Sequence, residues 1–369
     1  MLKPIHRVTS SPALAACQIM MQRLALWLCD QQVHAVDVTL INLQVQMPSQ
    51  IEADWLWKFL DRTVAKQKLL QRAKEVADLS NVEKQGLTNW VHGVSNIDQH
   101  FGLNPSHAFP AQIPNNWNDD SPSWISFKTL LIAFYERGFT KGRLPYRSDG
   151  TPTDIKSDQV TYAKFVAEFR VAHKLDAHPD AREICVLCGG ELKEQEVDHW
   201  INKANFPLLS VCADNLLPIC GECNAGDDTK GQKPVHSSGK FGDWFHPYLR
   251  PAHGALALEY QLPKMAISCV AAQAADQPKV NTLNKLLNLE TRWTREFKAE
   301  HRKKQKEAAD RKLRGRGPHN LAELQSWLTD YRDGLVESEP NYEVHKVLAA
   351  AMLEPTRLAT WQGELGLAP

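Results

Sequence analysis

Four of the eight cysteines form two Cys-x-x-Cys pairs, Cys185 with Cys188 and Cys220 with Cys223. Two such pairs, separated by roughly thirty residues, can present four thiolates to one tetrahedral zinc ion. The alternative, that these thiols are merely buried or redox-active, suits a single pair better than two. The spacing therefore predicts a structural zinc site, and thiols reserved for a metal indicate a reducing, cytoplasmic compartment.

The residues between and just after these pairs are of types that can hydrolyse a phosphodiester. Asp198 lies next to His199, Asn215 begins an Asn-Leu-Leu-Pro segment, and Asn224 follows the last cysteine directly. A neutral imidazole and a hard divalent cation together can activate water, stabilise charge on phosphorus and assist the leaving oxygen. Each feature alone also has an ordinary structural explanation, as a surface or capping pair or as a turn. Their combination with the cysteine pairs favours a site.

These motifs resemble those of the HNH endonuclease family, in its variant with a zinc clamp of four cysteines. The resemblance runs from Cys185 to Tyr248, under a fifth of the chain, and implies a ββα-metal fold of two strands and a helix around one catalytic cation. The matching segments are Cys-x-x-Cys-Gly, Val197-Asp198-His199, Asn215-Leu216-Leu217-Pro218, Cys-x-x-Cys-Asn224 and His246-Pro247-Tyr248.

The resemblance also implies a role for each of these residues. His199 would be the general base that takes a proton from the attacking water. Asp198 and Asn224 would hold Mg²⁺ or Mn²⁺ through oxygen atoms, which hard cations prefer. Asn215 would pin the loop between the strands so that the imidazole points at the phosphate, and the zinc ion would be a separate, structural ion.

Two positions leave their roles open. Family members often carry a lysine about three residues after the asparagine that corresponds to Asn224, whereas here residues 225–229 precede Lys230. The basic role therefore passes to Lys203 or Lys230, or the helix start is extended. His246 is either a phosphate or metal contact or a structural residue among neighbouring aromatic side chains.

A basic stretch further along the chain is a candidate surface for nucleic acid. Residues 292–316 contain eleven basic and four acidic side chains, an excess of seven positive charges. Several oppositely charged pairs at i,i+4 would equally suit an ordinary solvated helix. The unpaired excess favours phosphate binding, to duplex DNA because aromatic residues are not interleaved. The predicted nucleic-acid contacts are Lys203, Lys230, Arg302, Lys303, Lys304, Arg314 and Arg316.

The whole chain has 369 residues with 43 basic and 43 acidic side chains, so its net charge is zero. This balance excludes a uniformly basic coat. The apolar stretch 13–29 is too short and too often interrupted by polar residues to span a bilayer, so we expect a core helix and no membrane insertion. A signal peptide is the rival interpretation, but Arg23 interrupts the stretch and no cleavage site follows.

Hydrophobic periodicity predicts a mainly α fold with a small α+β insert. We expect a helical region over 1–177, with helices near 12–29, 51–79, 122–138 and 162–172. The zinc-clamped module would occupy 178–250. A hairpin near 256–269, a long basic helix from 280 and a helix pair over 321–365 would form the region 251–369.

Together these expectations describe a cytoplasmic, metal-dependent HNH endonuclease of DNA that uses Zn²⁺ structurally and Mg²⁺ or Mn²⁺ catalytically. One active site per chain would nick, and a double-strand break would need a homodimer. The helical flanks suggest recognition of a target or of a partner defence protein, as in the HNH effectors of restriction and anti-phage systems such as Zorya and Septu. The alternatives are a non-catalytic zinc module that binds nucleic acid or protein, and an RNA-cleaving enzyme.

Overall fold

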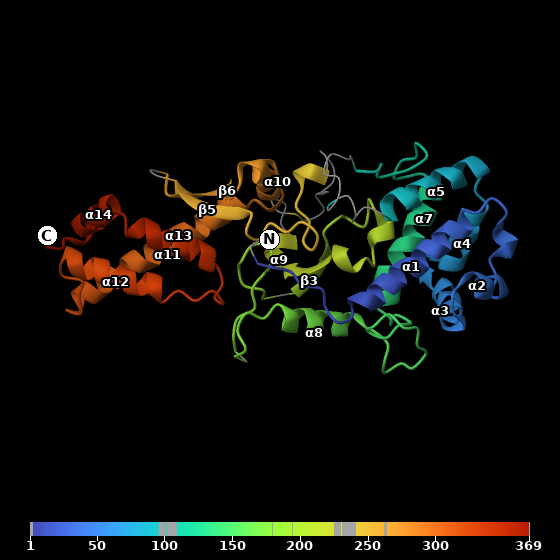
Figure 1. Ribbon diagram of the computed structural model, residues 1–369, viewed down its shortest axis with the longest axis horizontal. Coiled ribbons are helices and arrows are strands. Elements are labelled where there is room, and N and C mark those ends of the chain that lie inside the picture. The colour runs from blue at the N-terminus through green and yellow to red at the C-terminus, as the bar shows by residue number, and fades with distance from the viewer. Residues whose placement is uncertain are drawn as a thin grey trace.

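The computed structural model describes residues 3–95, 101, 109–178, 180–193, 195–224, 230, 241–261 and 264–368, with only the backbone at 195 and 196. Figure 1 shows these parts arranged along one long axis, with the first helices at one end, β3 and α9 in the middle and the last helices at the other end. The described chain is mostly helical, with three two-stranded sheets. The predicted mainly α class with a small β component is therefore confirmed.

Helices at the N-terminal end enclose a hydrophobic core. The stripe predicted for the first helix is fully buried on α1, at Leu14, Cys17, Met21, Leu24 and Leu28. The π-helix Phe134–Phe139 extends α7, which begins with proline in its first turn. The helices of this region are α1 (Ser11–Leu28), α2 (Leu40–Gln46), α3 (Gln50–Leu60), α4 (Leu69–Ala77), α5 (Asn81–Ser95), α7 (Pro122–Ala133) and α8 (Tyr162–Ala172).

The single helix predicted over 51–79 is wrong, because a small hairpin divides it into α3 and α4. Strands β1 (Thr63–Val64) and β2 (Gln67–Lys68) pair antiparallel. The two residues between them, Ala65 and Lys66, have φ of 47° and 67°. A two-residue hairpin turn with positive φ at both positions matches the twist of its strands. Apolar periodicity continues on both sides of this turn, so the sequence pattern does not reveal the hairpin.

The central module begins with a strand pair and continues into a short helix. Strand β3 (Gln195–His199) pairs antiparallel with β4 (Leu216–Cys220), with Asp198 opposite Leu217 and His199 opposite Leu216. All five residues of β4 are buried, and α9 (Gly221–Asn224) follows at once. The connection between the strands contains the 3-10 turns Pro207–Leu209 and Ala213–Asn215, which pack against α1, α5 and α7. N-terminal helices thus support the loop beside β3.

The C-terminal part contains the predicted hairpin, β5 (Leu256–Gln261) with β6 (Ala266–Ala271). The long basic helix predicted from residue 280 is two helices, because Asn288 adopts a left-handed φ of 50° between them. The predicted helix pair over 321–365 is three helices. The helices of the C-terminal part are therefore α10 (Gln277–Leu287), α11 (Leu289–Leu313), α12 (Leu321–Asp333), α13 (Tyr342–Met352) and α14 (Pro355–Leu365). Among the described residues, no helix combines the length and apolar character that crossing a membrane requires.

Candidate functional site

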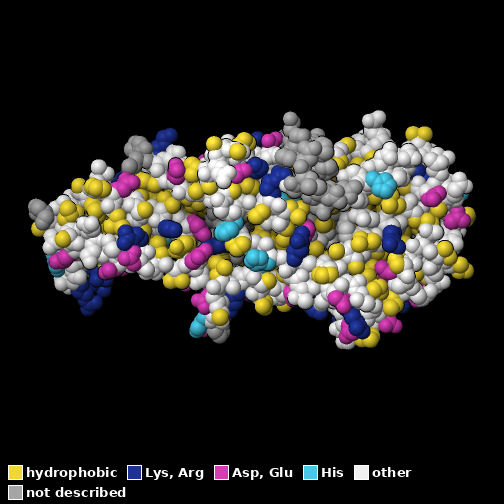
Figure 2. Space-filling model, viewed as in Figure 1, with side chains coloured by type: hydrophobic (Ala, Val, Ile, Leu, Met, Phe, Trp, Pro, Cys, Tyr) yellow, Lys and Arg dark blue, Asp and Glu magenta, His cyan; other side chains and the backbone are white. Residues whose placement is uncertain are grey.

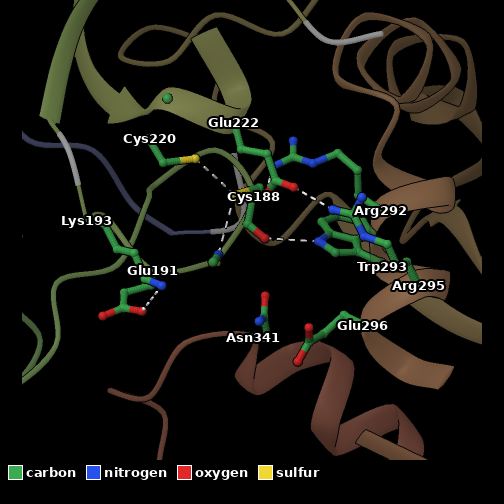
Figure 3. Close-up of a pocket in the computed structure, with 12 residues that line it drawn as sticks. Cys188, Glu191, Lys193, Cys220, Glu222, Arg292, Trp293, Arg295, Glu296 and Asn341 are labelled. Carbon is green, nitrogen blue, oxygen red and sulfur yellow. Dashed lines mark hydrogen bonds and ion pairs between the residues drawn. The ribbon is translucent and has the colours of Figure 1, made fainter. Parts of the chain in front are cut away.

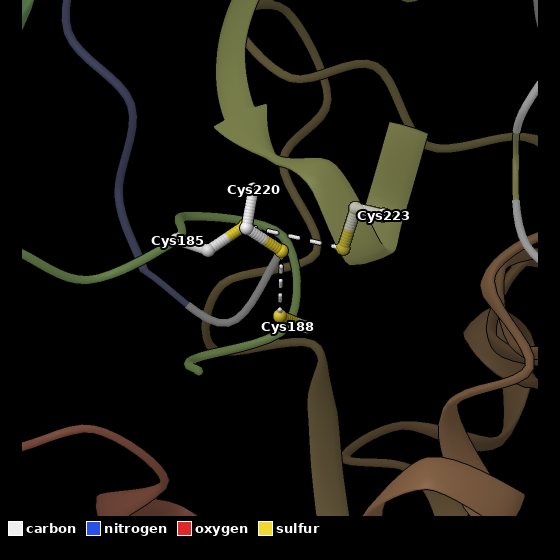
Figure 4. A group of neighbouring side chains, drawn as sticks. All are labelled: Cys185, Cys188, Cys220 and Cys223. Carbon is white, nitrogen blue, oxygen red and sulfur yellow. Dashed lines mark hydrogen bonds between the residues drawn. The ribbon is translucent and has the colours of Figure 1, made fainter. Parts of the chain in front are cut away.

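The two Cys-x-x-Cys pairs converge on one point, as Figure 4 shows. Cys185 and Cys188 lie in a turn closed by the bridge between Ile184 and Glu191, whereas Cys220 ends β4 and Cys223 lies in α9. The four sulfur atoms all lie within 4.8 Å of one another, with Cys185 to Cys223 at 3.9 Å and Cys188 to Cys220 at 3.8 Å. Four thiolates around a tetrahedral zinc ion, each about 2.3 Å from it, lie about 3.8 Å apart. The cluster therefore fits a metal ion such as zinc.

Two donors approach the sulfur atoms from outside the cluster. The backbone N–H of Gly190 donates to Sγ of Cys188 at 3.4 Å, and the guanidinium of Arg292 donates to Sγ of Cys223 at 3.3 Å. Arg292 also pairs with Glu222 at 3.1 Å. Burial alone would lower the pKa of Arg292, but the adjacent thiols of Cys223 and Cys188 raise it above its usual value. Arg292 thus places a fixed positive charge beside the thiolates.

Replacing Arg292 with glutamine is expected to weaken zinc binding by about 10–100-fold, the usual effect of losing a residue that supports metal ligands. The physical reason is that four thiolates around Zn²⁺ carry a net negative charge, which Arg292 partly neutralises. Competition with a chromophoric chelator measures the change. Arg295→Gln is the matched control, because Arg295 contacts Glu222 but no cysteine. Equal zinc affinity in the two variants would contradict the assignment.

A cavity of about 460 Å³ lies between the cysteine cluster and the C-terminal helices (Figure 3). Its charged walls pair internally, Glu191 with Lys193 at 3.5 Å and Glu222 with Arg295. The indole N–H of Trp293 on α11 donates to the carbonyl of Cys188 at 2.9 Å. The backbone N–H of Asn341, just before α13, donates to the carbonyl of Gly189 at 2.7 Å. These contacts fix the first cysteine turn against α11 and α13.

His199 lies at the end of β3 with one ring nitrogen fixed by the backbone. Its Nε2 is 2.8 Å from the carbonyl oxygen of Ser210. Because a carbonyl only accepts hydrogen bonds, Nε2 carries the proton and the neutral ring keeps its lone pair on Nδ1. Burial, with the nearby charges of Lys203 and Lys230, lowers the pKa of His199 to about 3. The imidazole is therefore a neutral group with a free lone pair on Nδ1 in the described structure.

Asn215 connects the chain after β3 to the turn that precedes Ser210. Its Oδ1 accepts the N–H of Ile201 at 2.6 Å, and its Nδ2 donates to the carbonyls of Ile201 at 2.9 Å and Leu209 at 3.1 Å. The side chain is buried, and all these partners are backbone groups. Asn215 thus holds the carbonyl of Ser210 in the position from which it orients His199.

Asp198 lies next to a buried ammonium. The side chain of Asp198 is 13% exposed and forms an ion pair with Lys230, which is only 1% exposed. The Nζ of Lys230 also donates to the backbone carbonyl of His199 at 2.7 Å. Asn224, the second expected oxygen donor, ends α9, and α9 packs against β3. The ammonium of Lys230 thus neutralises the Asp198 carboxylate in the described structure.

Tyr135 is a residue of this site that the sequence does not single out. It belongs to the π-helix after α7, and its ring lies edge-on to the ring of His199 with centroids 4.5 Å apart. Its hydroxyl is 3.4 Å from the carbonyl of Val197. Lys203 lies 4.5 Å from the Tyr135 ring centroid and pairs with Glu136 at 3.1 Å. The N-terminal region therefore covers His199, whose side chain is 5% exposed.

Part of the chain is similar to a phage protein. A stretch of 67 residues is 36% identical to protein ea31 of Escherichia phage lambda. It covers 18% of this chain and 21% of the phage protein, so the chain matches about a fifth of that protein's length. No protein-family model and no solved structure matches the chain.

His246 has a backbone-supporting role in the structure. Its Nδ1 accepts the N–H groups of Tyr248 and Leu249, each at 3.3 Å, and its ring lies 4.6 Å from that of Phe101. Burial lowers its pKa to about 3. Of the two interpretations left open for His246, this geometry favours the structural one.

Two groups stand out among the cations of the basic stretch. Several are bound within the fold: Arg292 at the cysteine cluster, Lys304 between Glu300 and Glu307, and Lys312 on the last carbonyls of α14. Five more, together with Glu307 and Asp310, line a groove of about 680 Å³. Its cations, here called the basic groove, are Lys303, Lys306, Arg311, Arg314 and Arg316. Figure 2 shows a group of Lys and Arg side chains projecting at the lower edge of the C-terminal end, with acidic side chains nearby.

Proposed function

We propose that this chain is a metal-dependent HNH endonuclease that hydrolyses DNA phosphodiester bonds. The observation that carries the proposal is the orientation of His199. Its Nε2 proton is held by the carbonyl of Ser210, so Nδ1 is the basic nitrogen, and the carboxylate of Asp198 precedes it on the same strand. A histidine held in this tautomer presents one acceptor nitrogen to a water molecule, which general-base catalysis requires.

The chain's own residues have separate tasks in this mechanism. Nδ1 of His199 accepts a proton from the attacking water, while Ser210 and Asn215 keep the ring in position. A divalent cation held by Asp198 and Asn224 would stabilise negative charge on the phosphate and on the leaving oxygen. The four cysteines would hold zinc, which would tie β4 and α9 to the turn that contains Cys185 and Cys188. With one such site, each binding event cuts one strand.

The proposal is tested by incubating supercoiled plasmid with the protein in Mg²⁺, Mn²⁺ or EDTA. Nicking that requires the divalent ion is the expected result. Nicking that persists in EDTA would contradict the proposed function, and so would a lack of nicking under all conditions. Parallel reactions with single-stranded DNA and RNA test the alternative of an RNA-cleaving enzyme. The burial of His199 under Tyr135 favours the second alternative, a non-catalytic zinc module, which predicts DNA binding without cleavage.

We further propose that the basic groove holds the DNA backbone, with Arg302 beside it on the exposed surface of α11. Replacing Lys306, Arg314 and Arg316 with glutamate is expected to lower affinity for duplex DNA at least tenfold at about 0.1 M salt. It should also flatten the salt dependence, since each lost phosphate contact reduces the log–log slope by about 0.9. Fluorescence anisotropy at several salt concentrations measures both quantities.

The matched control for the basic groove is a triple reversal of equal charge elsewhere. Lys58, Lys66 and Lys141 are exposed lysines of the N-terminal region. Their replacement with glutamate changes the net charge by the same amount but leaves the groove intact. If both triple variants lose affinity equally, only net charge matters and the basic groove is not the binding surface.

We also propose that the protein acts in the cytoplasm in restriction or anti-phage defence. This role is proposed because the chain resembles HNH effectors of such systems. The helical flanks would then recognise a partner or a target. Two copies would be needed for a double-strand break. Plaque counts on bacteria expressing the wild type or His199→Ala test this role, and equal phage resistance would exclude it.

A further inference from the structure

Lys230 is an unusual residue because its charged end is almost completely buried. Its side chain is 1% exposed, and a buried ammonium is costly unless it is paired and hydrogen-bonded. The described partners of its Nζ are the carboxylate of Asp198 and the carbonyl of His199. Both partners belong to the two residues that the proposed function assigns to metal binding and base catalysis. The ammonium therefore contacts both residues of the proposed site.

We propose that Lys230 and the divalent cation compete for Asp198, so that Lys230 closes the site in the absence of metal and leaves the carboxylate when metal binds. This proposal rests on the proposed function, which takes Asp198 as a metal ligand. In the metal-free protein the ammonium neutralises this mostly buried carboxylate. Metal binding and the departure of Lys230 are then one coupled event.

The competition follows from charge and from geometry. The ammonium pairs with Oδ2 of Asp198, and a hard cation requires the same carboxylate as an oxygen ligand. Two cations on one carboxylate at contact distance repel each other in a poorly solvated site. A second ammonium, that of Lys203, is close enough to His199 to lower its pKa. Lys203 is held by Glu136 instead of Asp198, so it provides a matched comparison.

The test is the affinity of the zinc-loaded, full-length protein for Mn²⁺, measured without DNA by the electron paramagnetic resonance signal of free Mn²⁺. Lys230→Met removes the charge and keeps the length of the side chain. It is expected to bind Mn²⁺ at least tenfold more tightly than the wild type. Lys230→Arg keeps the charge and should show no gain. Lys203→Met, the matched control, should bind Mn²⁺ as the wild type does.

Removing the ammonium from Asp198 could unfold the metal-free variant, so thermal unfolding gives a second measurement. Mn²⁺ should raise the melting temperature of Lys230→Met more than that of the wild type, because in the variant the ion replaces the positive charge that Lys230 supplied. Lys230→Gln, which keeps a donor for both oxygens, is the substitute if Lys230→Met does not fold. Equal Mn²⁺ affinities in the wild type and the uncharged variants would overturn the competition.

The outcome is separable from that of the proposed function. Tighter Mn²⁺ binding by Lys230→Met together with no cleavage by the wild type would support the competition for Asp198 and contradict the proposed nuclease activity. Unchanged Mn²⁺ affinity of Lys230→Met together with normal metal-dependent cleavage by the wild type would contradict the competition alone.

Discussion

Replacing His199 with alanine is expected to reduce metal-dependent nicking of supercoiled plasmid by about 10²–10⁴-fold, the usual contribution of a positioned general base. The reason is that Nδ1 of His199 is its only basic ring nitrogen, since Nε2 donates to the carbonyl of Ser210. The measurement is the initial rate of conversion to open circles at saturating Mg²⁺. Affinity for duplex DNA, measured without metal, should change little because the basic groove is intact.

The matched control for this prediction is His253→Ala, which removes an exposed histidine that follows the central module. It should nick at the wild-type rate. Zinc content and circular dichroism of His199→Ala must match the wild type, so that lost activity reports chemistry rather than unfolding. Nicking by His199→Ala at a rate near that of the wild type would remove His199 from the mechanism and, with it, the observation on which the function rests.

Features of this site that depend on local spacing could be predicted from the sequence. Each of the two Cys-x-x-Cys motifs places two thiolates close together whatever the surrounding fold. Only the approach of the two motifs to each other therefore depended on tertiary structure. The loop-pinning role of Asn215 was expected from the resemblance to HNH enzymes, and the described partners of its side chain all lie within the connection between β3 and β4. Local motifs carry this kind of information because few residues determine their geometry.

Features that depend on distant packing could not be predicted. Tyr135 is an unremarkable residue of a helical segment in the sequence, and only the packing of α7 against the central module brings its ring to His199. Lys230 was expected to contact nucleic acid, yet its side chain is buried and pairs with Asp198. Local i,i+4 pairing was expected within the basic stretch, and Lys304 does pair with Glu300, but Arg292 instead contacts the distant residues Cys223 and Glu222.

Helix boundaries show the same division. The stripe of α1 is long and continuous, so its periodicity is decisive. The break between α10 and α11 depends on one residue, Asn288, in a left-handed conformation that asparagine tolerates better than most residues. Apolar periodicity is nearly continuous across such a residue. A pattern averaged over several turns therefore misses it.

Replacing Cys220 with serine is expected to remove stoichiometric zinc and to destabilise the central module strongly. Structural zinc contributes about 10–16 kcal/mol of binding free energy in small zinc-binding domains, comparable with the whole stability of a domain. Cys220 ends β4 and Cys223 lies in α9, so loss of the zinc ion would free both elements from the turn that contains Cys185. Elemental analysis and thermal unfolding measure the two effects. Cys269→Ser, a buried cysteine of β6 outside the cluster, should retain zinc.

This prediction also separates the two metals, because the cysteine cluster and the Asp198 carboxylate prefer different ions. Wild-type protein treated briefly with EDTA should recover nicking when Mg²⁺ is added back, provided that its zinc is retained. Cys220→Ser should stay inactive at any Mg²⁺ concentration, because the position of His199 on β3 depends on its pairing with β4. A Cys220→Ser protein that keeps its melting temperature and its activity would show that the cluster is not a structural zinc site. The pairing of His199 with Leu216 would then have to be stabilised by contacts other than a zinc site.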